Sequence, residues 1–122
     1  MLNAKLPDFL TGLEASVLLF LLQEDTEDHR ILFEQLATCS LESRERNGYG
    51  FFTHFCITDF PRRCSIANFE LDDASVIVGG EHCGFILFVR DGKADFLEGF
   101  PLGGDAWPLS EAFEKVTRYK SC

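Results

Sequence analysis

The chain has few basic residues and no long apolar segment, and each shortage excludes a class of function. Its 122 residues include 11 Lys and Arg against 20 Asp and Glu, which gives a net charge of −9. Because like charges repel, this balance argues against binding nucleic acid, or an anionic membrane surface, through a basic face. The apolar run 17–22 is far shorter than the roughly 20 residues needed to span a bilayer.

Paired cysteines and a targeting segment are also missing. The five cysteines form no CxxC pair and show no regular disulfide spacing, so we expect reduced thiols. Acidic residues flank the apolar run 17–22 and no small-residue cleavage site follows it, so we predict no signal peptide and a cytoplasmic location. Gly103-Gly104-Asp105 lacks the strand-to-helix context of a phosphate loop. We therefore expect no cofactor.

Phenylalanine, in contrast, is abundant. The chain has 13 Phe against two Tyr and one Trp. Because the phenyl ring has no polar atom, most of these rings should be buried. Thirteen rings exceed what one small core accommodates, so we expect some on an exposed apolar patch. Such a patch favours a homodimer or a protein partner.

The first third of the chain predicts helices. With 122 residues and 46% hydrophobic content, we expect a single domain, 1–122. Thr11 and Glu14 have the spacing of a capping box, and apolar residues at helical spacing follow, which predicts a helix over about 12–23. A second acidic start at 25–28 leads into another apolar series. Helices should therefore occupy about 12–39 as a helical hairpin.

From Ser40 the pattern becomes that of strands, over about 40–120. We predict a polar edge strand at 40–46, a turn at Asn47-Gly48, a strand at 51–57, and an interrupted strand at 69–71 and 75–78. After Pro108 we expect a short helical turn and then an edge strand. The fold class is therefore α+β, with the helical hairpin packed on one face of an antiparallel sheet built from hairpins.

The central hairpin is organised by Asp91-Gly92, a pair typical of a type I′ turn. A two-residue loop places Arg90 opposite Lys93, and it predicts the pairs Val89–Ala94, Leu87–Phe96 and Phe85–Glu98. One face is then apolar except for Glu98, with Cys83, Phe85, Leu87, Val89, Ala94, Phe96 and Phe100. The other face carries Ile86, Phe88 and Leu97 beside Asp95. We expect helices to cover the first face and a partner or loop the second.

Seven short segments occur in a fixed order along the chain. They are Leu13-Glu14, Ser43-Arg44-Glu45, GYGFFT at 48–53, Gly84-Phe85, Asp91-Gly92, LEGF at 97–100, and Trp107-Pro108. This order resembles a family of small uncharacterised bacterial proteins over nearly the whole chain. The resemblance implies one α+β domain and, without established catalytic residues in the family, little about chemistry. The chain departs from the pattern at 101–104, where a Thr-Tyr-Asp-Gly type turn is usual, so a binding role of that turn does not carry over.

The cysteines and histidines raise two possible kinds of chemistry, a zinc site and a nucleophilic thiol. Donors that zinc accepts are His54, Cys56, Cys64, His82 and Cys83. Only the first two share a strand face by spacing, and buried cysteines with a surface histidine explain the set without metal, which is the interpretation we favour. Cys64, beside Arg62 and Arg63, is the best candidate for a nucleophile of low pKa. No Cys/His arrangement supports it, and adjacent arginines in a loop are usually solvated.

Glu98 is predicted to place a carboxylate among apolar neighbours, where desolvation raises its pKa unless a cation pairs with it. Arg44 and Arg46 are candidate cations. We favour a carboxylate satisfied by an arginine or by loop amides over a general acid or base.

The sequence thus favours a non-catalytic protein-binding domain, of the immunity or antitoxin kind. The alternative is a small enzyme or ligand binder with a pocket formed by Glu98, Trp107, His54 and Arg44. Convergence of these side chains in a concave site would favour the alternative, and dispersal would weaken it.

Overall fold

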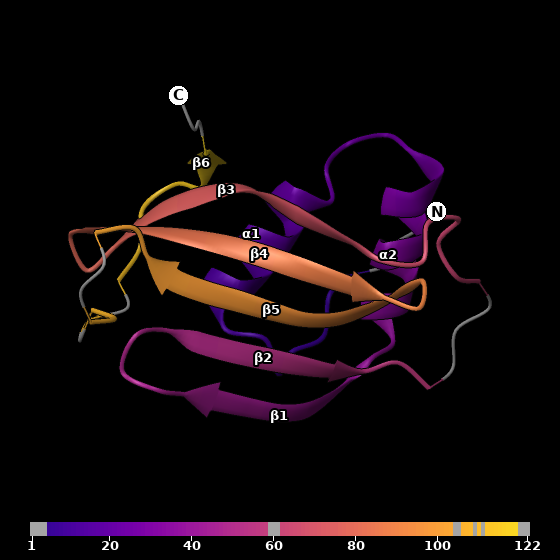
Figure 1. Ribbon diagram of the computed structural model, residues 1–122, viewed down its shortest axis with the longest axis horizontal. Helices are drawn as coiled ribbons and strands as arrows, with labels where there is room; N and C mark the ends of the chain where they lie inside the picture. The colour runs from indigo at the N-terminus through magenta and orange to yellow at the C-terminus, as the bar shows by residue number, and fades with distance from the viewer. Residues whose placement is uncertain (1–4, 59–61, 104–105, 109, 111, 120–122) are drawn as a thin grey trace.

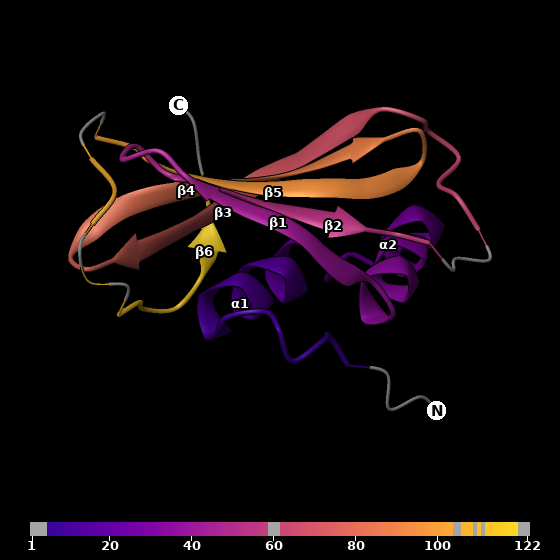
Figure 2. The same ribbon diagram turned by 90° about the horizontal axis from the view of Figure 1, so that it is seen from below.

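The computed structural model describes residues 5–58, 62–103, 106–108, 110 and 112–119 and confirms the α+β class (Figure 1). The elements in chain order are α1 (Gly12–Leu21), α2 (Glu27–Ala37), β1 (Ser40–Arg46), β2 (Phe51–Cys56), β3 (Phe69–Val78), β4 (Glu81–Arg90), β5 (Lys93–Pro101) and β6 (Thr117–Arg118). The strands form one antiparallel sheet in the order β1-β2-β5-β4-β3-β6. Both helices lie on the same side of this sheet (Figure 2). We call that side the inner face and the opposite side the outer face.

Each helix begins at a threonine that caps it. The Thr11 hydroxyl accepts a hydrogen bond from the backbone N–H of Glu14, and the Glu14 carboxylate accepts one from the N–H of Thr11, which confirms the capping box. The Thr26 hydroxyl accepts from the N–H of His29. Helix α1 contacts β3 and β4, whereas α2 contacts β5, so the helices cover different parts of the inner face. Within the described residues, no helix is both long and apolar enough to cross a membrane.

The core lies between the helices and the inner face. Its fully buried large side chains include Val17, Leu18, Leu32, Leu36, Val76, Val78, Phe85, Leu87, Val89 and Leu97. Among the described phenylalanines, Phe51, Phe55 and Phe85 are the ones buried in this core. Trp107 is buried beside them, with its ring centroid 5.2 Å from that of Phe51 and 6.0 Å from that of Phe85. Phe9, Phe20, Phe33 and Phe69 are partly buried and pack against this core, and the other described phenylalanines lie outside it.

The β4–β5 hairpin keeps the predicted turn but not the predicted register. Asp91 and Gly92 both have positive φ, 56° and 72°, as a type I′ turn requires. Arg90 lies opposite Lys93 and Val89 opposite Ala94, as predicted. A bulge then shifts the pairing, because Phe88 pairs with Phe96 and leaves one extra residue on β5. The predicted pairs Leu87–Phe96 and Phe85–Glu98 are therefore wrong.

The bulge also exchanges the two faces of β5. Since side chains alternate along a strand, one extra residue moves every later side chain to the opposite face. Leu97, predicted on the face away from the helices, is fully buried in the core. Phe96, Glu98 and Phe100, predicted on the covered face, are half-buried on the outer face.

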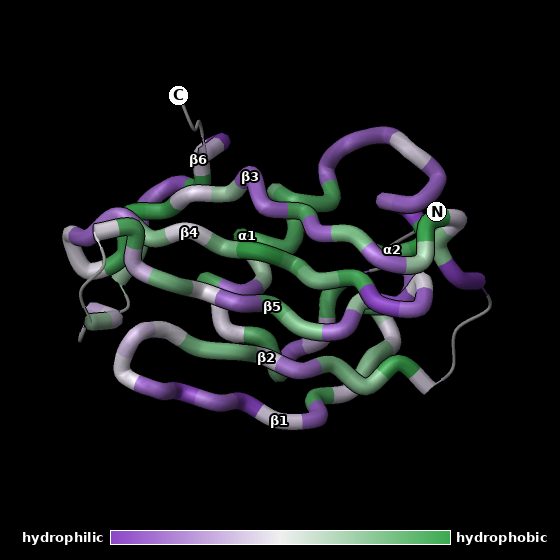
Figure 3. Tube along the Cα trace, in the orientation of Figure 1, coloured by the Kyte–Doolittle hydropathy of each residue, from purple (hydrophilic) through white to green (hydrophobic). Residues whose placement is uncertain are grey.

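The remaining strands follow the sequence pattern closely. β1 spans the predicted residues and is hydrophilic for most of its length (Figure 3). β3 is one continuous strand with a register shift between Leu71 and Ala74, which explains why its sequence pattern is interrupted. β6 confirms the final edge strand by pairing with β3.

The helical turn predicted after Pro108 is wrong for the described residues there. Their backbone groups bond to the end of β3 instead, since the N–H of Gly79 donates to the carbonyl of Ala112 and the N–H of Glu114 donates to that of Ile77. Leu109, directly after Pro108, lies outside the described residues, as do Gly104 and Asp105 of the segment Gly103-Gly104-Asp105.

Candidate functional site

The four residues of the predicted pocket do not converge. Glu98 and His54 lie on the outer face, on β5 and β2. Trp107 is buried on the inner side against Phe51. Arg44 projects from β1 to the carboxylate of Glu14 in α1. This dispersal weakens the pocket on which the enzyme or ligand-binder alternative depends.

Arg44 belongs to a buried polar cluster centred on Glu14. The Glu14 side chain is 3% exposed and accepts hydrogen bonds from Arg44 Nη2 at 2.6 Å and from Arg44 Nε at 3.1 Å. The hydroxyl of Thr53 in β2 also donates to it. Burial alone would raise the pKa of Glu14, but the bonds from Arg44, Thr53 and the Thr11 backbone outweigh it, and the pKa is lower than usual. The cluster is fully satisfied and therefore joins α1 to the first two strands.

The sequence contains a signal for this cluster that the prediction missed. Glu14 precedes Val17, Leu18 and Leu21 by three, four and seven residues, which puts its side chain on the buried face of the helix. A carboxylate on such a face needs a cation. Arg44 was, with Arg46, a candidate cation for Glu98, but the register shift carries Glu98 to the outer face.

The outer face carries a row of half-buried rings that crosses three strands. The Phe88 and Phe96 rings are stacked, with centroids 4.4 Å apart and planes inclined by 16°. Phe96 in turn lies 5.9 Å from Phe52 and 5.3 Å from His54. We call Phe52, His54, Phe88 and Phe96 the ring row. Neither helix covers it, because both lie on the inner face (Figure 2).

Glu98 lies directly beside the ring row. Its cross-strand neighbours are Phe52 on β2 and Ile86 on β4, and its same-face neighbours along β5 are Phe96 and Phe100. Apolar side chains thus surround the carboxylate on four sides, and this burial raises the pKa of Glu98. Within the described part of the chain, Glu98 has no hydrogen bond or ion pair.

Two other carboxylates at this face do have cationic or ring-nitrogen partners. Glu45 Oε2 lies 3.3 Å from His54 Nε2, and Glu70 Oε2 lies 3.3 Å from Arg90 Nη1. The Arg90 guanidinium also covers the Phe88 ring, with Cζ 5.2 Å from the ring centroid. The ring row therefore has a cation at its Phe88 end, whereas the Glu98 carboxylate beside the row has no cationic partner in the described chain.

The apolar surface continues beyond the rings toward β3. A shallow hollow of about 120 Å³ is lined by Ile86, Phe100 and Leu102 among others, with Asp72 at its edge. Leu102 is 37% exposed and Tyr119, which also lines the hollow, is 41% exposed. The ring row and this hollow together form an apolar surface on one side of the molecule.

The five metal donors considered from the sequence are scattered. Cys64 and Cys83 are buried, whereas His82 is exposed at the start of β4. His54 and Cys56 share the outer face of β2, as their spacing indicates. Among the described residues, no three His, Cys, Asp or Glu side chains are grouped so that they would hold a metal ion.

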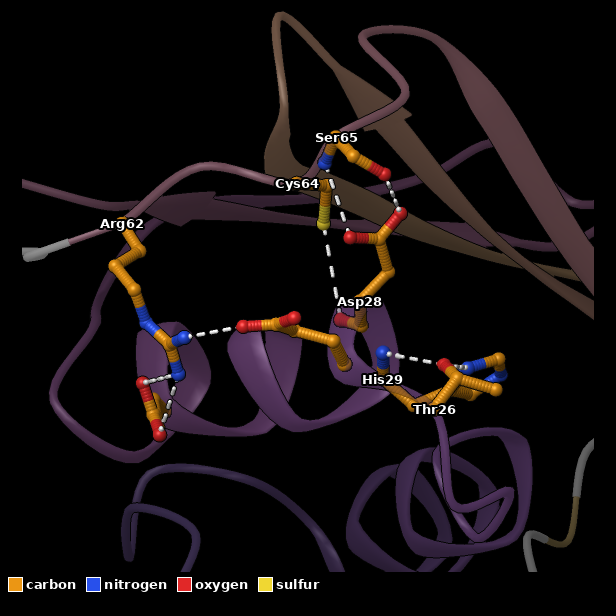
Figure 4. Close-up of polar contacts among 8 residues, drawn as sticks. Thr26, Asp28, His29, Arg62, Cys64 and Ser65 are labelled. Carbon is orange, nitrogen blue, oxygen red and sulfur yellow. Dashed lines mark hydrogen bonds and ion pairs between the residues drawn. The ribbon is translucent and has the colours of Figure 1, made fainter.

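Cys64 lacks the cationic surroundings that the sequence indicated (Figure 4). Arg62 pairs with Glu27 and Glu34 of α2, and Arg63 pairs with Asp91. The Cys64 thiol points to the backbone carbonyl of Asp28, 3.7 Å away. Burial and the charge of Asp28 raise the pKa of Cys64 to about 11. This opposes the low-pKa nucleophile, the alternative that the sequence did not favour.

This environment predicts an unreactive thiol. At pH 8 we expect iodoacetamide to modify Cys64 roughly 100-fold more slowly in the folded protein than in urea, since a pKa of about 11 leaves far fewer thiolates than the usual value. The tryptic peptide 64–90 also contains Cys83, so tandem mass spectrometry, which locates the label on Cys64, measures both rates. Equal rates in the two states would contradict the burial described here.

Comparison of the chain with protein-family models, with curated proteins and with solved structures finds no match in any of the three.

Proposed function

We propose that the chain is a non-catalytic protein-binding domain, of the immunity or antitoxin kind, that binds its partner through the outer face of the sheet. The observation that carries the proposal is the ring row, an uncovered aromatic surface across three strands. Aromatic side chains of this kind are enriched at protein interfaces, where they supply large contact areas.

Charge indicates the nature of the partner. The net charge of −9 makes long-range attraction to a basic surface favourable and opposes binding to another acidic one. Glu45, Glu70 and Glu98 bring some of this charge to the outer face itself. A protein with a basic contact surface therefore fits better than a second copy of this acidic chain.

Catalysis has less support. The buried Glu14 cluster has all its groups paired, and its partners lower the pKa of Glu14, which opposes proton transfer near neutral pH. Glu98 has a raised pKa, but the Trp107 and Arg44 side chains that would complete a site with it lie on the inner side.

The proposal is tested by photo-crosslinking from the outer face. We would incorporate benzoylphenylalanine at Phe96 and, as a matched control, at Leu19, which is 52% exposed on α1. In cells of the source organism we expect position 96, but not position 19, to cross-link one partner protein. With that partner purified, Phe96→Thr should weaken binding about tenfold or more, because central aromatic residues dominate interface energies.

Three results would contradict the proposal. The first is no cross-link from position 96, and the second is a cross-link only to another copy of the chain. The third is a partner whose affinity is unchanged by Phe96→Thr while the Trp107 fluorescence of the variant shows a native core.

A further inference from the structure

Glu98 is the one described outer-face carboxylate with apolar side chains on all four sides. Its neighbours in the sheet are Phe52, Ile86, Phe96 and Phe100. A carboxylate in such surroundings gives up part of its hydration and gains nothing in return unless a donor reaches it. No group of the described chain donates to Glu98, so its half-exposed carboxylate is hydrated by water and is open to a donor from a partner.

The same face shows how a suitable donor would sit. At the other end of the ring row, Arg90 lies over the Phe88 ring, with Cζ 5.2 Å from the centroid, while its Nη1 lies 3.3 Å from Glu70. One guanidinium thus contacts a ring face and a carboxylate at once. At Glu98 the Phe52 and Phe96 side chains and the carboxylate are neighbours in the sheet, and no guanidinium of the described chain pairs with that carboxylate.

We infer that Glu98 and the adjacent rings of Phe52 and Phe96 form a binding site for an arginine side chain of a protein partner. The inference rests on the proposed function, since it names the side chain of the partner that the outer face would bind. The guanidinium donates to the Glu98 carboxylate while its plane lies against a ring, and the apolar hollow beside Phe100 receives a neighbouring apolar side chain of the same segment. The partner segment is therefore basic and contains arginine next to an apolar residue.

Arginine fits this site better than lysine. Its guanidinium is planar, stacks on aromatic rings, donates two parallel hydrogen bonds to a carboxylate and is more weakly hydrated than an ammonium group. A lysine would pair with Glu98 as a point charge but would gain less from the rings. The acidic chain attracts both equally at long range, so a preference between them reports the short-range site.

The test uses two capped peptides that differ only in their cation, Gly-Ser-Arg-Leu-Ser-Gly and the same sequence with lysine in place of arginine. Binding is followed by the NMR shifts of backbone amides in the full chain. We expect saturable shifts at Phe52, Ile86 and Phe96 with the arginine peptide and an affinity at least about threefold lower for lysine. Glu98→Gln should lower the arginine affinity about fivefold, the upper end of the range for one charge pair at a partly exposed site.

Asp95→Asn is the matched control, because it removes the same charge from the same strand. It should change the affinity less than twofold in about 0.15 M salt, where charges beyond about 8 Å are screened. Glu98→Gln is expected to fold, because the raised pKa of Glu98 shows that its charge opposes folding. Equal affinities for the two peptides, no saturable shift up to a few millimolar, or shifts confined to the acidic hollow of Glu24, Glu70 and Asp73 would overturn the inference.

Different results would contradict the proposed function and the arginine site. If a partner binds through Phe96 and Glu98→Gln binds that partner as tightly as the wild type, the arginine site is wrong and the proposed function stands. If the arginine peptide binds at Glu98 with the expected preference but position 96 cross-links no partner in cells, the site stands and the proposed function is wrong.

Discussion

Replacing Arg44 with alanine is expected to lower the free energy of unfolding by about 3 kcal/mol at pH 7. The reason is that the substitution leaves the Glu14 carboxylate, whose side chain is 3% exposed, without its cation. The Arg44 side chain itself is 29% exposed, which keeps the expected loss at the lower end of the range for buried ion pairs. Urea unfolding followed by Trp107 fluorescence measures the change.

Two variants separate the buried charge from other effects of this substitution. Arg30→Ala removes an exposed arginine that pairs with Asp25, and we expect it to cost less than about 1 kcal/mol. The double variant Glu14→Gln/Arg44→Ala should be more stable than Arg44→Ala alone, because it removes the unpaired charge. If the double variant is the less stable of the two, the cost of Arg44→Ala does not come from the carboxylate.

The pKa of Glu14 gives this prediction a pH dependence. Since the folded-state pKa is lower than usual, ionised Glu14 contributes stability above the unfolded-state pKa, and the contribution is lost as the pH falls through the folded-state pKa. In Arg44→Ala the isolated carboxylate is instead easier to protonate. The difference in stability between the wild type and Arg44→Ala should therefore be largest near neutral pH and shrink as the pH falls below about 5.

Gln35→Leu is expected to cost about 2–3 kcal/mol, because it removes the three hydrogen bonds of a buried amide side chain. Gln35 is fully buried in α2, and its Nε2 donates to the carbonyls of Arg62 and Gly92, each at 3.0 Å. Its Oε1 accepts from the backbone N–H of Ala94 at 2.9 Å. Leucine leaves the Ala94 N–H without this acceptor next to the turn that organises the central hairpin.

Hydrogen exchange locates the effect of Gln35→Leu. The amide of Ala94 should exchange faster in the variant than the global loss of stability explains, while amides of β1 should follow the global change. Gln23→Leu at an exposed position is the control, with an expected change within about 0.5 kcal/mol. Unchanged protection of Ala94 would show that the Gln35 bond does not hold the hairpin.

The sequence predicted the fold well wherever local signals determine it. The capping box at Thr11, the β1 strand and the Asp91-Gly92 turn all depend on neighbours in the chain, and all are confirmed. The bulge in β5 has no comparable signal in the sequence, because neither Ala94 nor Asp95 is a residue type that by itself indicates a bulge. Ala94, beside the bulge, donates to Gln35 of α2, and this contact is distant in sequence.

The failure to predict this bulge affected the prediction of the candidate site most. The sequence correctly placed Glu98 among apolar neighbours and Phe88 with Ile86 on the less covered face. It assigned Phe96 and Glu98 to the other face, so the ring row was not foreseen. The Glu14 cluster was missed for a different reason, because pairing Glu14 with Arg44 requires knowing that β1 crosses the start of α1.

The charged edge strand β1 restricts how this protein associates with others. Its seven residues are nearly all exposed, and four of them, Glu42, Arg44, Glu45 and Arg46, are ionic. A strand from a second molecule that added to this edge would have to place its own side chains against these charges, which is a common protection against amyloid-like growth. Copies that meet at high concentration are therefore kept from joining their sheets at β1, while the aromatic outer face remains available to a specific partner.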